Sequence, residues 1–108
     1  MQNNQFGFET GDLETILAVI KQYPAVEQAI IFGSRAKGNY KKGSDVDIAL
    51  KGDINFNIIS RINSTLNEET NLPYKFDIIN YAQIDNLALS EHINRVGIVF
   101  YLDHPPRN

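Results

Sequence analysis

Two aspartates spaced by two residues, Asp45 and Asp47, are the side chains in this sequence best suited to chemistry. Asp47 lies within the apolar run VDIAL and is therefore predicted to sit inside a β-strand. Residues at i and i+2 of a strand point to the same face, so the two carboxylates are expected to share one. Like charges in an apolar setting are costly without a cation between them, which makes the pair a candidate metal site. The alternative for Asp47 is a structural salt bridge to Arg35 or Lys37.

A glycine-serine pair, Gly33-Ser34, follows the apolar run AIIF, and ten residues separate it from Asp45. Glycine lets a chain turn sharply and lets a phosphate approach the backbone, while Ser34 can offer its hydroxyl and its N–H at the start of a helical turn. The simpler interpretation is a turn glycine followed by a helix N-cap. Basic residues gather around this pair, as expected for a phosphate site. Five of the ten in the sequence lie here: Arg35, Lys37, Lys41, Lys42 and Lys51.

A third carboxylate, Asp77, lies within the strand-like segment KFDIIN. Alone, it would be interpreted as an edge-strand charge that pairs with Lys75 or faces water. Beside Asp45 and Asp47 it could ligate a metal and accept a proton from an attacking hydroxyl, if its strand neighbours theirs. The two histidines, His92 and His104, have no metal-like spacing and are interpreted as ordinary surface or packing residues.

The elements that must position these residues can be read from periodicity and from breaks at glycine and proline. Apolar residues at helical spacing predict helices over Asp12–Tyr23, Ile54–Glu69 and Ile84–Arg95, the last with Leu87, Glu91 and Arg95 aligned on one face. Strands are predicted over Val26–Phe32, Asp45–Lys51, Lys75–Asn80 and the segment IVFYL. The order of helices and strands indicates an α/β or α+β fold, with helices packed against a small mixed sheet.

The length of 108 residues fits a single domain over 1–108, with a loose lead-in at 1–10 and a tail at 103–108. Phe6 and Phe8 are expected to pack on the domain. The net charge of -3 argues against sequence-independent binding to nucleic acid, and the absence of cysteine excludes disulfides and thiolate metal sites. No leader-like segment or membrane-length apolar run is seen, so no membrane association and a cytoplasmic location are expected.

The segment GSRAKGNYKKGSDVDIAL, extended by LPYKFDIIN, resembles the nucleotidyltransferase superfamily typified by DNA polymerase beta. The resemblance covers about Ile30 to Asn80. Within the superfamily, the short chain is similar to the minimal nucleotidyltransferase (MNT) domain, which is often encoded beside a HEPN-domain partner as the antitoxin of a toxin–antitoxin pair. The resemblance implies the nucleotidyltransferase fold.

The resemblance also implies roles for individual residues. Gly33 and Ser34 would hold the terminal phosphates of the nucleotide. Asp45 and Asp47 would bind two Mg²⁺ ions, and Asp77 would complete the metal site and activate the acceptor hydroxyl. Arg35 could neutralise phosphate charge.

The implied reaction is in-line attack of a hydroxyl on the α-phosphorus of a nucleoside triphosphate such as ATP, with pyrophosphate leaving. By analogy with the family, the acceptor would be a tyrosine of a HEPN partner toxin, which is inactivated by adenylylation. Two alternatives stay open: a non-catalytic module that masks a partner, and an antibiotic nucleotidyltransferase that works with a second subunit.

Overall fold

A four-stranded sheet in the order β3-β2-β1-β4 forms the centre of the computed structural model, which describes residues 5–103. β1 pairs antiparallel with both β2 and β4, and β2 pairs parallel with β3, so the sheet is mixed as predicted. The strands are β1 Val26–Phe32, β2 Val46–Gly52, β3 Phe76–Asn80 and β4 Ile98–Leu102. The helices are α1 Asp12–Ile20, α2 Ser34–Lys37, α3 Phe56–Ser64 and α4 Leu87–Val96. The predicted α/β fold class is confirmed.

Helix boundaries differ from the predicted ones where asparagine side chains cap the first turn. The side-chain oxygen of Asn55 accepts a 2.9 Å bond from the N–H of Ile58, and that of Asn86 accepts a 3.1 Å bond from the N–H of Leu89. These caps start α3 and α4 later than Ile54 and Ile84, because a capping residue is itself not helical. The predicted helix to Glu69 is also divided, since α3 passes into a π-helical turn at Thr65–Glu69.

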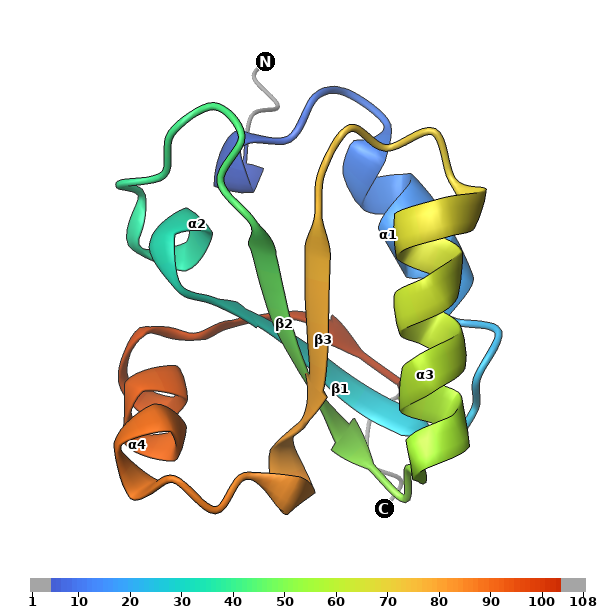
Figure 1. Cartoon of the computed structure of the whole chain (residues 1–108), viewed down its shortest axis with the longest axis vertical. Coiled ribbons are helices and arrows are strands. Elements are labelled where there is room, and N and C mark those ends of the chain that lie inside the picture. Colours follow the sequence, from blue (N-terminus) through green and yellow to red (C-terminus); the bar gives the residue numbers. More distant parts are fainter. Residues whose placement is uncertain (1–4, 104–108) are drawn as a thin grey trace.

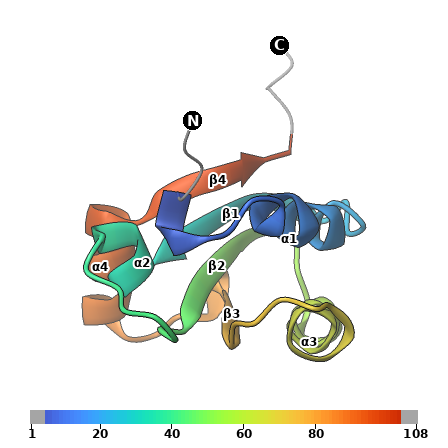
Figure 2. The same cartoon turned by 90° about the horizontal axis from the view of Figure 1, so that it is seen from above.

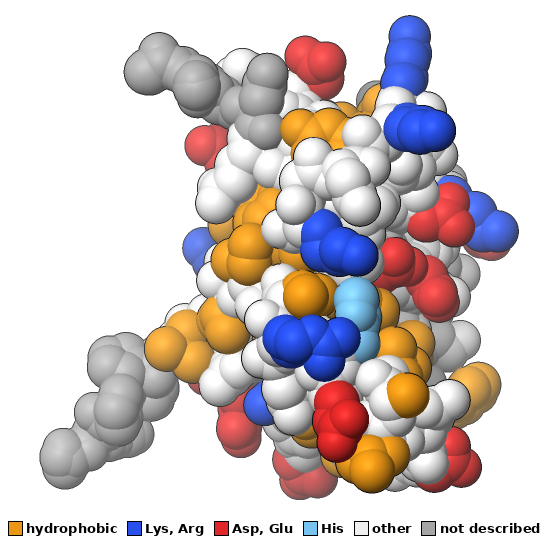
Figure 3. Space-filling view, turned by 90° about the vertical axis from the view of Figure 1, so that its left-hand side faces the viewer, with side chains coloured by type: hydrophobic (Ala, Val, Ile, Leu, Met, Phe, Trp, Pro, Cys, Tyr) orange, Lys and Arg blue, Asp and Glu red, His pale blue; other side chains and the backbone are white. Residues whose placement is uncertain are grey.

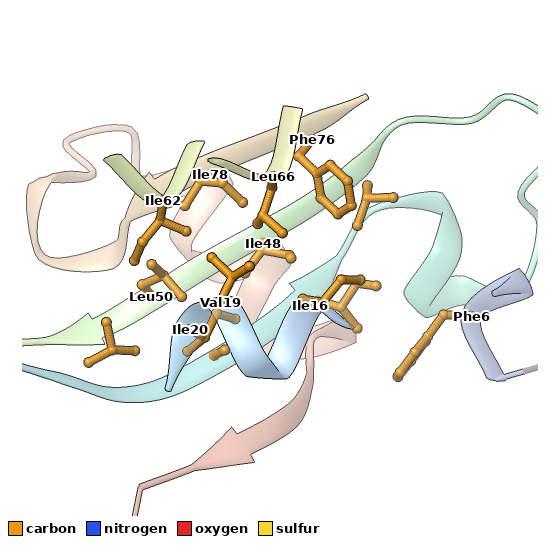
Figure 4. Close-up of a cluster of buried hydrophobic side chains, with 14 of the residues drawn as sticks. Phe6, Ile16, Val19, Ile20, Ile48, Leu50, Ile62, Leu66, Phe76 and Ile78 are labelled. Atoms are coloured by element: carbon orange, nitrogen blue, oxygen red, sulfur yellow. The ribbon is translucent and has the colours of Figure 1, made fainter. Parts of the chain in front are cut away.

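One face of the sheet carries the larger core. α1 and α3 lie side by side over this face, whereas α4 lies on the opposite side (Figures 1 and 2). Figure 4 shows the apolar side chains of the two helices meeting those of the strands. Its fully buried members include Ile16, Ile20, Ile48, Leu50, Ile62 and Leu66. Each such side chain contributes about 1.5–3 kcal/mol on burial, so this layer supplies much of the stability of the fold.

The opposite face has a smaller core, built under α4. Ile93 of α4 is buried against Ile30 and Phe32 of β1 and Ala49 of β2. The predicted alignment of Leu87, Glu91 and Arg95 therefore marks the outer side of the helix, and Leu87 is 70% exposed.

The start of the described chain packs on the domain. Phe6 and Phe8 are buried, with their ring centroids 6.0 Å apart, and Phe6 also lies 6.5 Å from the ring of Phe100 in β4. Residues 1–4 of the predicted lead-in and 104–108 of the predicted tail, including His104, lie outside the described residues. Within 5–103, no helix has the length and apolar character needed to cross a membrane.

Candidate active site

Three residues from three strands form a row across the sheet. Asp47 in β2 is the register partner of Phe32 in β1 and of Asp77 in β3. Residues directly opposite on paired strands point to the same face. This face is the one that α4 covers, since Phe32 contributes to the core under that helix. The pairing of β2 with β3 thus brings together Asp47 and Asp77, which are thirty residues apart in the sequence.

The backbone of Gly33 lies against the carboxylate of Asp47. A Cβ built on Gly33 would come within 2.5 Å of Oδ2 of Asp47, and the backbone has a φ of +75°. Both features require glycine, because a side chain would collide with the carboxylate and because L-residues rarely adopt this φ. Gly33 is also the N-cap residue of α2, and Ser34 is the first helical residue. The predicted alternative of Ser34 as the N-cap is therefore wrong, and Ser34 stands at the first turn, next to the carboxylates.

Asp45 lies one residue before β2 and is exposed. It is close enough to act on Asp47 electrostatically. Burial raises the pKa of Asp47 above its usual 3.8, and the negative charges of Asp77 and Asp45 raise that pKa further. Mutual repulsion among three carboxylates is what a bound cation would relieve.

The three aspartates offer the carboxylate oxygens that Mg²⁺ prefers. Asp47 and Asp77 are register neighbours, Asp45 lies within electrostatic range, and the backbone of the adjacent Gly33 closely approaches the Asp47 carboxylate. These observations fit a divalent metal. Among residues 5–103, however, no three acidic or histidine side chains are gathered closely enough to make a ready-formed metal site. The predicted ligands therefore lie on one face of the sheet, but they are not close enough together to surround a metal ion.

Arg35 takes a position that differs from the predicted phosphate contact. Only 4% of its surface is exposed, and its guanidinium donates to the carbonyl oxygens of Phe6 at 2.8 Å and Ser44 at 2.8 and 3.2 Å. The same group lies 4.9–5.6 Å from the ring centroids of Phe8, Tyr40 and Tyr74. The guanidinium of Arg35 is thus used by contacts inside the protein. This argues for a positioning role of Arg35 in place of the expected neutralisation of phosphate charge.

What Arg35 positions is the loop that carries Asp45. Two of its hydrogen bonds reach the carbonyl of Ser44, the residue just before Asp45. The charges that act on Asp47 are those of Asp77, Asp45 and His92, so the alternative salt bridge to Arg35 or Lys37 finds no support. Lys51, another of the predicted phosphate-site cations, also lies elsewhere: its Nζ is 4.4 Å from the ring centroid of Tyr81.

His92, whose sequence context predicts an ordinary surface or packing residue, lies beside this site. His92 of α4 is half-buried, its ring centroid lies 6.2 Å from that of Phe32, and its charge lowers the pKa of Asp47. Figure 3 shows the face of the molecule that carries α2 and α4, where histidine, acidic and basic side chains meet. No sequence motif links residue 92 to the carboxylates. Its place beside the site follows only from the way α4 packs on the sheet.

The fold is that of a nucleotidyltransferase, and the carboxylate row lies on one face of its sheet. The sequence matches the family described as "Polymerase beta, Nucleotidyltransferase" over residues 14–105. The match covers most of the chain, so the protein belongs to this family, whose members generally use a nucleoside triphosphate and a divalent metal. Comparison with curated proteins found no match.

Solved structures with similar folds include several toxin–antitoxin complexes. A complex with AMP-PNP superposes with a TM-score of 0.70 at 17% identity, over 83% of this chain and 73% of the other. A variant of the MntA-HpeT pair gives 0.68 at 17% identity, over 83% and 72%. The tri-AMPylated HEPN toxin of Shewanella oneidensis, in complex with its MNT antitoxin, gives 0.62 at 15% identity, over 82% and 67%. At these identities the likeness establishes the fold.

Proposed function

We propose that this protein is a cytoplasmic antitoxin that transfers AMP from ATP to a tyrosine hydroxyl of a HEPN-domain partner, using Mg²⁺. The observation that carries the proposal is the row of Asp47 and Asp77, with Gly33 held against the Asp47 carboxylate. Family membership supports nucleotidyl transfer, and the similar complexes, one with AMP-PNP and one with a tri-AMPylated HEPN toxin, support this donor and acceptor.

The chain contributes carboxylates and a backbone turn to the reaction. Asp45, Asp47 and Asp77 would hold the Mg²⁺ ions, which when bound offset the charge of the phosphates and of the leaving group. The turn at Gly33-Ser34 offers backbone N–H groups and the serine hydroxyl to the terminal phosphates. These groups orient the nucleotide with its α-phosphorus toward β2 and β3.

Asp77 is suited to act as the base because it is exposed at the end of the row. It accepts the proton of the attacking hydroxyl, whose oxygen forms a bond to the α-phosphorus. The bond between that phosphorus and the bridging oxygen to the β-phosphate breaks, and its electron pair leaves with pyrophosphate. The products are an AMP–tyrosine phosphodiester and pyrophosphate.

The test is transfer of label from α-³²P-ATP, with Mg²⁺, to the HEPN-domain partner. Wild-type protein should label the partner, and a partner with its acceptor tyrosine changed to phenylalanine should stay unlabelled. Asp77→Asn should reduce the rate by at least about a hundredfold, as expected on loss of a general base. Asp53→Asn, which changes an exposed aspartate beyond β2, is the matched control and should leave the rate unchanged.

Two outcomes would contradict the proposal. No labelling by wild type, together with a complex that survives Asp45→Ala plus Asp47→Ala, would favour the masking module. Labelling of a small hydroxylated antibiotic in place of the partner protein would favour the antibiotic nucleotidyltransferase.

A further inference from the structure

His92 lies next to the site on α4, a helix that supplies none of the site residues predicted from the sequence. Its ring packs edge-on against Phe32, with 6.2 Å between the centroids and an interplanar angle of 80°. Phe32 immediately precedes Gly33 and is the register partner of Asp47. His92 is half-buried, so the residue keeps some exposed surface. Among residues 5–103, no hydrogen bond of the imidazole is found.

α4 is fixed on the sheet by contacts on either side of His92. Ile93 is 1% exposed in the core under the helix. The hydroxyl of Tyr81 donates a 2.8 Å hydrogen bond to Oδ1 of Asn94. A Cβ on Gly97 would come within 2.6 Å of Cγ2 of Ile30, so the end of the helix lies directly on β1. The position of His92 beside the site is therefore set by packing.

The location of His92 indicates which part of the nucleotide the side chain would contact. His92 lies beside β1, which leads into the Gly33-Ser34 turn, whereas Asp77 lies two strands away, about 10 Å across the sheet. A ligand group that contacts His92 is thus the part held at Gly33-Ser34. The other basic residue next to that turn, Arg35, uses its guanidinium on the carbonyls of Phe6 and Ser44.

We propose that His92 is a nucleotide-binding residue whose imidazole donates a hydrogen bond to the β- or γ-phosphate of the triphosphate held at Gly33-Ser34. This inference rests on the proposed function, because it assumes that the turn holds those phosphates. An imidazole N–H is a suitable hydrogen-bond donor to a phosphate oxygen. The residue would strengthen binding of the triphosphate over that of a monophosphate.

Two substitutions separate this role from packing. His92→Phe keeps an aromatic ring against Phe32 and removes both N–H groups, whereas His92→Gln removes the ring and keeps a donor. Binding of ATP and of AMP, each with Mg²⁺, is measured by titration calorimetry, using competition where affinity is low. Arg95→Gln, on the outer side of α4, is the control.

We expect His92→Phe to weaken ATP binding about tenfold, the loss of one charge-assisted hydrogen bond, and to leave AMP binding unchanged. His92→Gln should lose less, and Arg95→Gln nothing. Thermal unfolding checks that each variant folds, and His92→Ala replaces His92→Phe if that variant does not.

Unchanged ATP affinity in His92→Phe would overturn the inference, and so would equal weakening of ATP and AMP, which indicates a packing role. Failure of wild type to bind ATP with Mg²⁺ would overturn the proposed function itself. The two failures are therefore told apart by the wild-type titration.

Discussion

At the scale of single residues, the site depends on how closely Gly33 approaches Asp47. The carboxylate occupies the space that a side chain at position 33 would need, and the backbone there has a positive φ. Glycine is thus required at position 33 for two reasons: the positive φ, and the close approach of Asp47, which lies fourteen positions later in the sequence. A second glycine, Gly43, has a similar φ of +89°, but a Cβ there would meet nothing within 4 Å beyond its chain neighbours.

We predict that Gly33→Ala destabilises the protein more than Gly43→Ala does. An alanine held in a backbone conformation with positive φ costs roughly 1–3 kcal/mol. Gly33→Ala adds the collision with Asp47, which costs about another 1–3 kcal/mol. Urea unfolding measures both variants, and equal losses would mean that the carboxylate simply rotates away. Nucleotidyl transfer should be lost in Gly33→Ala and kept in Gly43→Ala.

The pH dependence of stability should reveal the crowding of Asp47 by other carboxylates. Burial and the charges of Asp77 and Asp45 raise its pKa above 3.8, so the folded state keeps this proton to higher pH than the unfolded chain. Without metal, stability therefore falls as the pH rises from 3.8 through the folded-state pKa. Asp47→Asn removes this loss.

In EDTA, Asp47→Asn should be more stable than wild type near neutral pH, and the advantage should shrink as the pH is lowered toward 3.8. Urea unfolding at a series of pH values measures the difference. A variant that is less stable than wild type at neutral pH would instead show that Asp47 forms a stabilising ion pair.

At the scale of elements, Arg35 links the start of the described chain to the loop before β2. Its guanidinium bonds to the carbonyls of Phe6 and Ser44, which lie on either side of α2 in the sequence. The loop that presents Asp45 is thereby held from inside the protein.

We predict that Arg35→Met destabilises the protein by about 2–4 kcal/mol, because buried carbonyls lose charged donors. Arg35→Lys should recover only part of this, since an ammonium cannot reproduce the forked geometry. Lys37→Met, on the exposed end of α2, is the control. Amide hydrogen exchange should rise in residues 39–45 of the Arg35 variants, and unchanged exchange there would argue against the positioning role.

The inner and outer sides of α4 should differ in their contribution to stability. Ile93→Ala should cost about 2–4 kcal/mol by leaving a cavity in the core under the helix. Leu87→Ala, at a position 70% exposed, should cost less than about 1 kcal/mol. Urea unfolding measures both, and a larger loss in Leu87→Ala would contradict the observed orientation of the helix.

At the scale of the whole molecule, ligand binding should stabilise the fold if the three aspartates act together. At a hundredfold excess of ATP with Mg²⁺ over the dissociation constant, the gain is about 2.7 kcal/mol. This gain should be visible as a higher melting temperature in wild type and absent in Asp45→Asn plus Asp47→Asn. Retention of the full shift in the double variant would contradict metal binding by these residues.

The boundaries of two strands could be predicted from the sequence, whereas the ends of two helices could not. The bounds of β1 and β4 agree with the predicted ranges because apolar runs end at clear breaks such as Gly33 and Gly97. The ends of α3 and α4 were less predictable, since Asn55 and Asn86 act as caps only in a chain that already follows the fold.

The sequence by itself determined the three aspartates, the Gly33-Ser34 turn and the alternation that turns Asp47 and Asp77 toward one side of their strands. These features depend on local spacing, because alternate residues of a strand point to the same face of the sheet. Only the tertiary structure decided that β3 pairs with β2, that Arg35 is enclosed by aromatic rings and that His92 packs against Phe32, the register partner of Asp47. These depend on contacts between distant segments, where burial and packing determine whether a basic side chain faces the interior or the ligand.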